Sequence, residues 1–187
     1  MLPILLLTLS AFSSPHPEVI SLANIQYDRD TIVEVDNTTR ISVRYHGYNE
    51  STAIETLDAI RESSVLARSY LENEGMSSRD CKILSLDVYD IDRSDLNNRG
   101  IIAFFRWGDK SFSKIYAFYD SILSPPGRSS IFISASKEND ENGLSERKRA
   151  EILSHEMMHY WQDRTCNISH DLEEQADRFG IFAQDRI

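Results

Sequence analysis

The chain has 187 residues, of which 41% are hydrophobic and 27% are charged, so it is neither disordered nor collagen-like. It carries 20 Lys and Arg against 30 Asp and Glu, which gives a formal net charge of −10. Because nucleic acids and anionic membranes attract basic surfaces, this charge argues against both as partners. The length suits one domain, and no apolar run is long enough to span a membrane.

The first residues predict a secretory signal peptide over 1–13. Residues 2–12 (LPILLLTLSAF) form an apolar run with the length of a signal-peptide core. The small residues Ala11 and Ser13 predict cleavage after Ser13. No Lys or Arg precedes the run, and a buried N-terminal element is the alternative. The segment predicts a secreted, extracellular or periplasmic protein.

The two cysteines of the chain, Cys81 and Cys166, fit an exported domain with one disulfide. Closing a loop of this length would add on the order of 4 kcal/mol in the chain-entropy model. The alternative is two unpaired, buried thiols.

Hydrophobic periodicity predicts a hairpin and then a long helix. Strands are expected at 31–35 and 40–46, within an N-terminal hairpin segment over 14–50. A helix is expected over 52–73, opened by a capping box of Thr52 and Glu55 and followed by Gly75. Its apolar residues recur at helical spacing, namely Ile54, Leu57, Ile60, Leu66, Tyr70 and Leu71.

The second half of the chain predicts four strands and two helices. Strands are expected at 82–91, 101–107, 114–122 and 130–135. Helices are expected at about 145–162 and 171–183. This order indicates an α+β fold with a small mixed or antiparallel sheet packed on helices.

The motif His155-Glu156-Met157-Met158-His159 lies in the first of these two helices. Histidines four positions apart share one helix face, so both rings can reach one zinc ion. Glu156 points beside the metal and is placed to accept a proton from metal-bound water. The motif therefore indicates zinc hydrolase chemistry with Glu156 as general base.

The following helix offers a third ligand in the segment Leu172-Glu173-Glu174-Gln175-Ala176-Asp177. Glu173 and Asp177 share a helix face, so Glu173 can complete a site of two His and one Glu. Asp177 can accept a hydrogen bond from the outer nitrogen of a ligand histidine, with His155 preferred. Three protein ligands leave one position open, which is typical of catalytic zinc and not of structural zinc.

This pair of motifs resembles the gluzincin metallopeptidases, of which thermolysin is the familiar case. The resemblance covers about residues 82–183 and implies a zincin-like catalytic domain within 51–187, one Zn²⁺ per chain and a peptide or protein substrate. Residues 116–119 resemble the edge strand of these enzymes. By that analogy the backbone of Ala117, Phe118 and Tyr119 would pair with an extended substrate.

The chain departs from thermolysin-like enzymes after the third ligand, because only 14 residues follow Glu173. Those enzymes take the donors that stabilise the oxyanion from a further domain. Candidates for this role here are His170, Tyr160, Tyr116 and Tyr119, which the sequence does not rank. A missing donor would cost about 10²–10³ in rate.

Other interpretations of the same residues stay open. Glu174 and Cys166 are rival third ligands, the histidines are alternatively surface residues, and the zinc is alternatively structural. A secreted binding factor on a zincin scaffold and a zinc hydrolase of non-peptide substrates are the alternative functions. Calcium binding by the acidic loop 138–142 is not expected, because the loop lacks EF-hand spacing.

Overall fold

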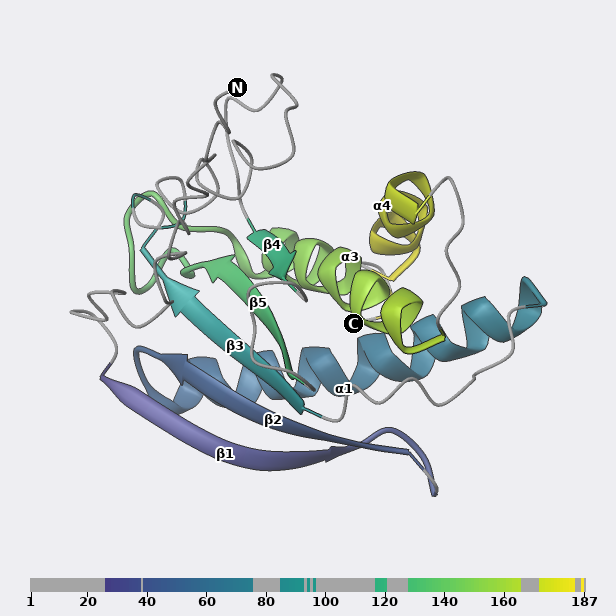
Figure 1. Ribbon diagram of the computed structural model, residues 1–187. Coiled ribbons are helices and arrows are strands. Elements are labelled where there is room, and N and C mark those ends of the chain that lie inside the picture. Colours follow the sequence, from purple (N-terminus) through teal and green to yellow (C-terminus); the bar gives the residue numbers. More distant parts are fainter. Residues whose placement is uncertain are drawn as a thin grey trace, which may run out of the picture.

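A mixed β-sheet with helices on one side organises the part of the chain that the structure describes (Figure 1). The structure is a computed structural model, and it describes residues 26–37, 39–75, 85–92, 94, 96, 117–120, 128–165, 172–183 and 186. The elements are β1 (Tyr27–Glu34), β2 (Arg40–Gly47), α1 (Glu50–Asn73), β3 (Ser85–Ile91), β4 (Ala117–Asp120), β5 (Arg128–Ser134), α3 (Glu146–Thr165) and α4 (Leu172–Ala183). The expected α+β class is confirmed.

The five strands lie in the order β1-β2-β3-β5-β4. The outer pairs β1–β2 and β4–β5 are antiparallel, whereas β2–β3 and β3–β5 are parallel. The sheet is thus mixed, and the predicted hairpin forms one end of it. At the other end, β4 is the outermost of the described strands, and it lies beside α3.

Helix α1 begins two residues earlier than the sequence predicts. The side-chain oxygen of Asn49 accepts a hydrogen bond from the backbone N–H of Thr52 at 2.9 Å, so Asn49 is the N-cap. The predicted capping box of Thr52 and Glu55 is therefore wrong, because Asn49 already satisfies the first turn. The predicted end is confirmed: α1 ends at Asn73, and Gly75 has a φ of 77°, which glycine adopts without strain.

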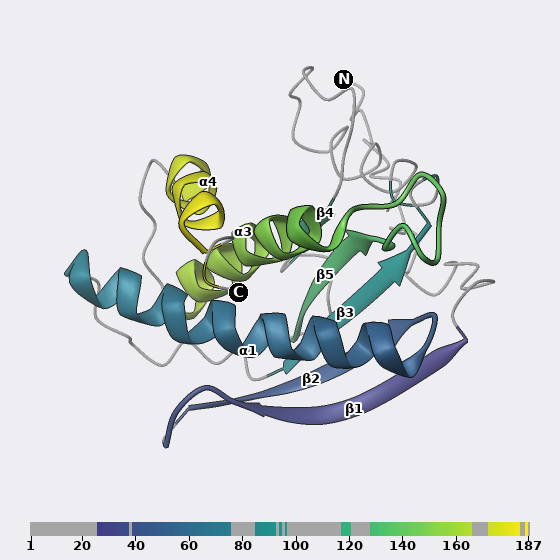
Figure 2. The same cartoon turned by 180° about the vertical axis from the view of Figure 1, so that it is seen from behind.

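The main hydrophobic core lies between the sheet and helices α1 and α3 (Figure 2). From α1, Leu57, Ile60 and Leu71 are buried as expected, but Ile54 is 46% exposed and lies outside the core. Its helical position turns it away from the sheet, so the prediction for Ile54 is wrong. Helix α3 contributes a second set of buried residues, namely Leu153, Met157, Met158, Tyr160 and Trp161.

A buried ion pair joins the first turn of α3 to the sheet. The two terminal guanidinium nitrogens of Arg149 donate to the carboxylate of Asp90 on β3, at 2.9 and 2.8 Å. The same guanidinium donates to Thr56 on α1, and Tyr45 on β2 donates to Asp90 at 2.8 Å. Helix α3 is therefore oriented by charged and polar contacts at its start as well as by apolar packing.

Several predicted features lie outside the described residues. These are the N-terminal segment 1–13, the strand expected at 101–107, and the two cysteines Cys81 and Cys166. Among the residues that are described, no helix has the length and apolar character that a membrane span requires.

Candidate metal centre

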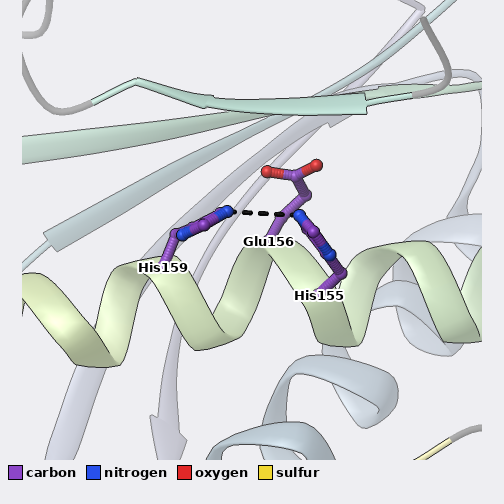
Figure 3. A group of neighbouring side chains, drawn as sticks. All are labelled: His155, Glu156 and His159. Carbon is purple, nitrogen blue, oxygen red and sulfur yellow. Dashed lines mark hydrogen bonds between the residues drawn. The ribbon is translucent and has the colours of Figure 1, made fainter. Parts of the chain in front are cut away.

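Helix α3 presents the two histidines and the glutamate of the motif near the middle of its length. His155 and His159 point toward one another, with Glu156 beside them (Figure 3). Their Nε2 atoms are 3.2 Å apart, because positions one turn apart lie on the same helix face. His155 and His159 are half-buried, whereas Glu156 is buried at 6% exposure.

Helix α4 brings Glu173 to the same point. One carboxylate oxygen of Glu173 lies 3.3 Å from Nε2 of His155, and the other lies 3.2 Å from Nε2 of His159. The two helices pack closely enough for this contact because Gly180 has no side chain. A Cβ at Gly180 would lie 3.1 Å from the backbone oxygen of Glu151 and 3.3 Å from Cβ of His155.

The outer ring nitrogens of both histidines face oxygen atoms that accept hydrogen bonds. Nδ1 of His155 lies 3.1 Å from a carboxylate oxygen of Asp177, as the sequence predicts. Nδ1 of His159 lies 2.8 Å from the amide oxygen of Gln162. Because these oxygens accept hydrogen bonds, each Nδ1 must carry a hydrogen. In the neutral form of each ring, Nε2 then has a free lone pair, and both lone pairs face Glu173.

This donor set fits a zinc ion. Two lone pairs and a carboxylate converge on one point, which is electrostatically unfavourable unless a cation, either protons or a metal, lies between them. In a tetrahedral site with bonds of about 2.0–2.1 Å, ligand atoms are about 3.3–3.4 Å apart. The 3.2 Å between the two Nε2 atoms lies close to that value, as do the 3.3 and 3.2 Å from these nitrogens to the two different oxygens of Glu173. Two overlapping groups of potential metal ligands are found among the described residues, His155 with Glu156 and His159, and His155 with Glu173 and Asp177.

Burial raises the pKa of the Glu156 carboxyl above its ordinary value, although the nearby histidines oppose this effect. The backbone N–H of Tyr119 on β4 donates a hydrogen bond to the Glu156 carboxylate. A carboxyl with a raised pKa is suited to take up a proton and pass it on. The edge strand therefore holds the group that the sequence identifies as the base.

The two histidines and the two glutamates of the cluster shift one another's pKa values. Burial by itself lowers the pKa of His155 and of His159, but hydrogen bonding to Glu173 and the charge of Glu156 outweigh burial and raise both pKa values. Hydrogen bonds from His155 and His159 hold the pKa of Glu173 far below its ordinary value. Glu173 is consequently a carboxylate at any physiological pH and is available to a cation.

Strand β4 lies beside the cluster. Tyr119 stacks near the ring of His159 with centroids 6.4 Å apart, and its hydroxyl donates to Asp163 on α3 at 2.8 Å. Burial raises the pKa of Tyr119, so its hydroxyl stays protonated. Ala117 and Phe118, the other residues proposed to meet a substrate, belong to the same edge strand and pair with Ile133 and Phe132 of β5.

The remaining predicted residues lie elsewhere. Glu174 is exposed and contacts Arg178, at 3.7 Å, one turn along α4. Tyr160 is wholly buried in the core at 0% exposure, so a substrate oxygen does not reach it. His170, Tyr116, Cys81 and Cys166 lie outside the described residues.

Sequence reasoning missed two buried amide side chains that lie between α3 and α4 near the cluster. Gln162 and Gln175 are buried at 3% and 5% exposure and hydrogen-bond to each other. Gln162 follows His159 by three positions, so helical spacing placed it on the correct face. The sequence did not predict the partner of Gln162, because nothing in the sequence of α4 indicates that Gln175 contacts Gln162.

Comparisons with protein-family models, with curated proteins and with solved structures found no match for this chain.

Proposed function

We propose that the protein is a secreted zinc metallopeptidase of the gluzincin type, with a zincin-like catalytic domain and Glu156 as general base. The ligands would be His155, His159 and Glu173. When bound, Zn²⁺ in such a site polarises the scissile carbonyl and lowers the pKa of water toward about 7.

One observation carries this proposal. His155, His159 and Glu173 come from two helices and converge with separations of 3.2–3.3 Å, while Asp177 and Gln162 orient the two rings. A chance group of surface histidines would lack partners on both outer nitrogens. Three protein ligands leave a position free for a reactant, which is the arrangement of catalytic zinc sites.

Glu156 would move the protons of peptide hydrolysis. As the water oxygen bonds to the carbonyl carbon, Glu156 accepts a proton from that water. Glu156 then donates a proton to the amide nitrogen as the carbon–nitrogen bond breaks. Its burial favours this role, because a raised pKa makes the carboxylate a better acceptor for the proton of the water.

Strand β4 would hold the substrate. It is the outermost strand among the described residues, and an extended peptide can add to the edge of a sheet through backbone hydrogen bonds. The N–H of Tyr119 holds Glu156, so a peptide bound along β4 would pass close to the base. The signal-like segment 1–13 supports export.

The test compares the mature chain, residues 14–187, with Glu156→Gln on a diverse peptide library, with cut sites identified by mass spectrometry. We expect cleavage by the parent protein that stops with a zinc chelator and falls by at least about 10²-fold in Glu156→Gln, because the proton acceptor is lost. Glu156→Gln should still bind one zinc per chain, since Glu156 is not a ligand.

Cleavage that persists in Glu156→Gln would contradict the role of Glu156. Bound zinc without cleavage of any peptide would favour the secreted binding factor or a hydrolase of another substrate class. A parent protein that binds no zinc would overturn the proposal as a whole.

A further inference from the structure

The side chain of Gln162 is buried between α3 and α4, one turn after His159. It is 3% exposed, and its neighbour Gln175 on α4 is 5% exposed. Burying an amide costs free energy unless each of its polar atoms finds a partner. The amide of Gln162 has partners on both of its atoms, and they lie on two different helices.

The hydrogen bonds determine which way this amide faces. Its nitrogen donates to the backbone oxygen of Leu172 at 2.9 Å and to the side-chain oxygen of Gln175 at 2.9 Å. A backbone carbonyl only accepts, so the atom of Gln162 that faces Leu172 must be the nitrogen. The amide oxygen is thereby left to face Nδ1 of His159, 2.8 Å away.

This orientation selects one tautomer of His159. An amide oxygen accepts hydrogen bonds and donates none, so Nδ1 of His159 must carry a hydrogen. In the neutral ring Nε2 then holds the free lone pair, and Nε2 is the atom 3.2 Å from Glu173. Gln162 therefore accepts a hydrogen bond from Nδ1 of His159, as Asp177 accepts one from Nδ1 of His155.

The same amide also holds the start of α4. Leu172 is the first residue of α4 and directly precedes Glu173. The bond from Gln162 to the Leu172 carbonyl ties this end of α4 to α3. One uncharged side chain thus contacts a ligand histidine on one side and the residue beside the ligand glutamate on the other.

We propose that Gln162 is a positioning residue of the metal centre. Its amide sets the tautomer and orientation of His159 and fixes the first turn of α4, which carries Glu173. This inference rests on the proposed zinc site. Partners of metal-ligating histidines commonly contribute about 10–100-fold in metal affinity, and we assign a contribution of this size to Gln162.

The test compares the parent protein with Gln162→Met, which keeps the length of the side chain and removes the amide, and with Gln175→Leu as a matched control. Gln175→Leu also removes a buried amide from this network, but it leaves the contacts of Gln162 with His159 and Leu172. Zinc affinity is measured by competition with a chromogenic chelator. Histidine tautomers are measured by ¹⁵N NMR of the metal-free proteins, at a pH above the raised pKa values of His155 and His159, where both rings are neutral.

We expect zinc affinity to fall by about 10–100-fold in Gln162→Met and by less than about threefold in Gln175→Leu. In the NMR spectra, His159 should lose its preference for the Nδ1–H form only in Gln162→Met. His155 is the internal control, because Asp177 still holds its ring. A general loss of structure would disturb both histidines, whereas the proposed role disturbs His159 alone.

An unchanged tautomer of His159 in Gln162→Met, or a zinc affinity within about threefold of the parent, would overturn the proposal. If Gln162→Met does not fold, Gln162→Glu tests the contact with Leu172 instead. Its carboxylate still accepts from His159 but cannot donate to Leu172, so zinc affinity should fall while the Nδ1–H form persists, and a zinc affinity within about threefold of the parent would overturn the proposal. A parent protein that binds no zinc would refute the proposed function, and the tautomer shift would then support only the orienting role of Gln162.

Discussion

At the scale of single residues, Glu173 and Glu174 differ in position and not in chemistry. Both are carboxylates in the first turn of α4, and both are exposed. One step along a helix turns a side chain by about 100°, so only Glu173 faces the histidines of α3. Glu174 faces Arg178 instead. The neighbouring pair therefore offers a matched experiment on the third ligand.

We expect Glu173→Gln to weaken zinc binding by more than about 100-fold, because the change removes the anionic ligand, a larger loss than that of a ligand's hydrogen-bond partner. Glu174→Gln should leave zinc affinity unchanged. Competition titration with a chelator measures both variants. A loss of affinity in Glu174→Gln alone would make Glu174 the third ligand.

At the scale of helices and strands, the site depends on the close packing of α4 against α3. Gly180 lies where the helices approach, opposite Glu151 and His155. Glycine lowers intrinsic helix stability by about 1 kcal/mol relative to alanine, so its presence inside α4 is explained by the approach of the helices and not by propensity. A larger side chain there would move Glu173 and Asp177 away from the histidines.

Gly180→Val should destabilise the protein by about 1–3 kcal/mol, because the added methyl groups meet the α3 backbone. Zinc affinity should fall in the same variant. The control is Ile181→Val, since Ile181 is 60% exposed on the same helix and a smaller side chain there meets nothing. Urea unfolding measures stability, and chelator competition measures affinity. If stability and zinc affinity in Gly180→Val equal those of the parent protein, the site does not depend on the close packing of α4 against α3.

At the scale of the whole molecule, the ion pair of Arg149 and Asp90 links the elements around the site. Its contacts reach α1 through Thr56, β2 through Tyr45 and β5 through the backbone oxygen of Ser134. Burial raises the pKa of the Tyr45 hydroxyl, which keeps it a donor to Asp90. The network sets the position of α3 on the sheet, and with it the position of the histidines beside β4.

Arg149→Met should lower the free energy of unfolding by about 3–5 kcal/mol, because the change leaves the charge of Asp90 buried without a partner. Arg147→Met is the matched control, since Arg147 is exposed on the same helix, and it should cost less than about 0.5 kcal/mol. Thermal and urea unfolding measure both variants. Equal costs for the two would mean that the buried pair contributes no more than a surface charge.

Much of this architecture follows from local sequence patterns. The chain order of the described helices and strands was predictable because apolar periodicity and turn residues act over a few positions. The spacing of His155 and His159, and that of Glu173 and Asp177, follows from the helical repeat alone. These pairs share a face in any helix that contains them, whatever the helix packs against. The start of α1 shows the limit of prediction from local sequence. Asn49 and Thr52 are both residue types that favour the N-cap position, and only Asn49 occupies it.

The sequence by itself thus determined the α+β class, the helix that carries the histidines and the pairing of residues within each helix. Only the tertiary structure decided the strand order, the meeting of Glu173 with both histidines, and the partners of Gln162 and Arg149. The physical reason is the distance along the chain over which each kind of interaction acts. Residues within one helix are related by a fixed repeat, whereas contacts between elements depend on how buried surfaces pack, and no short stretch of sequence encodes that packing.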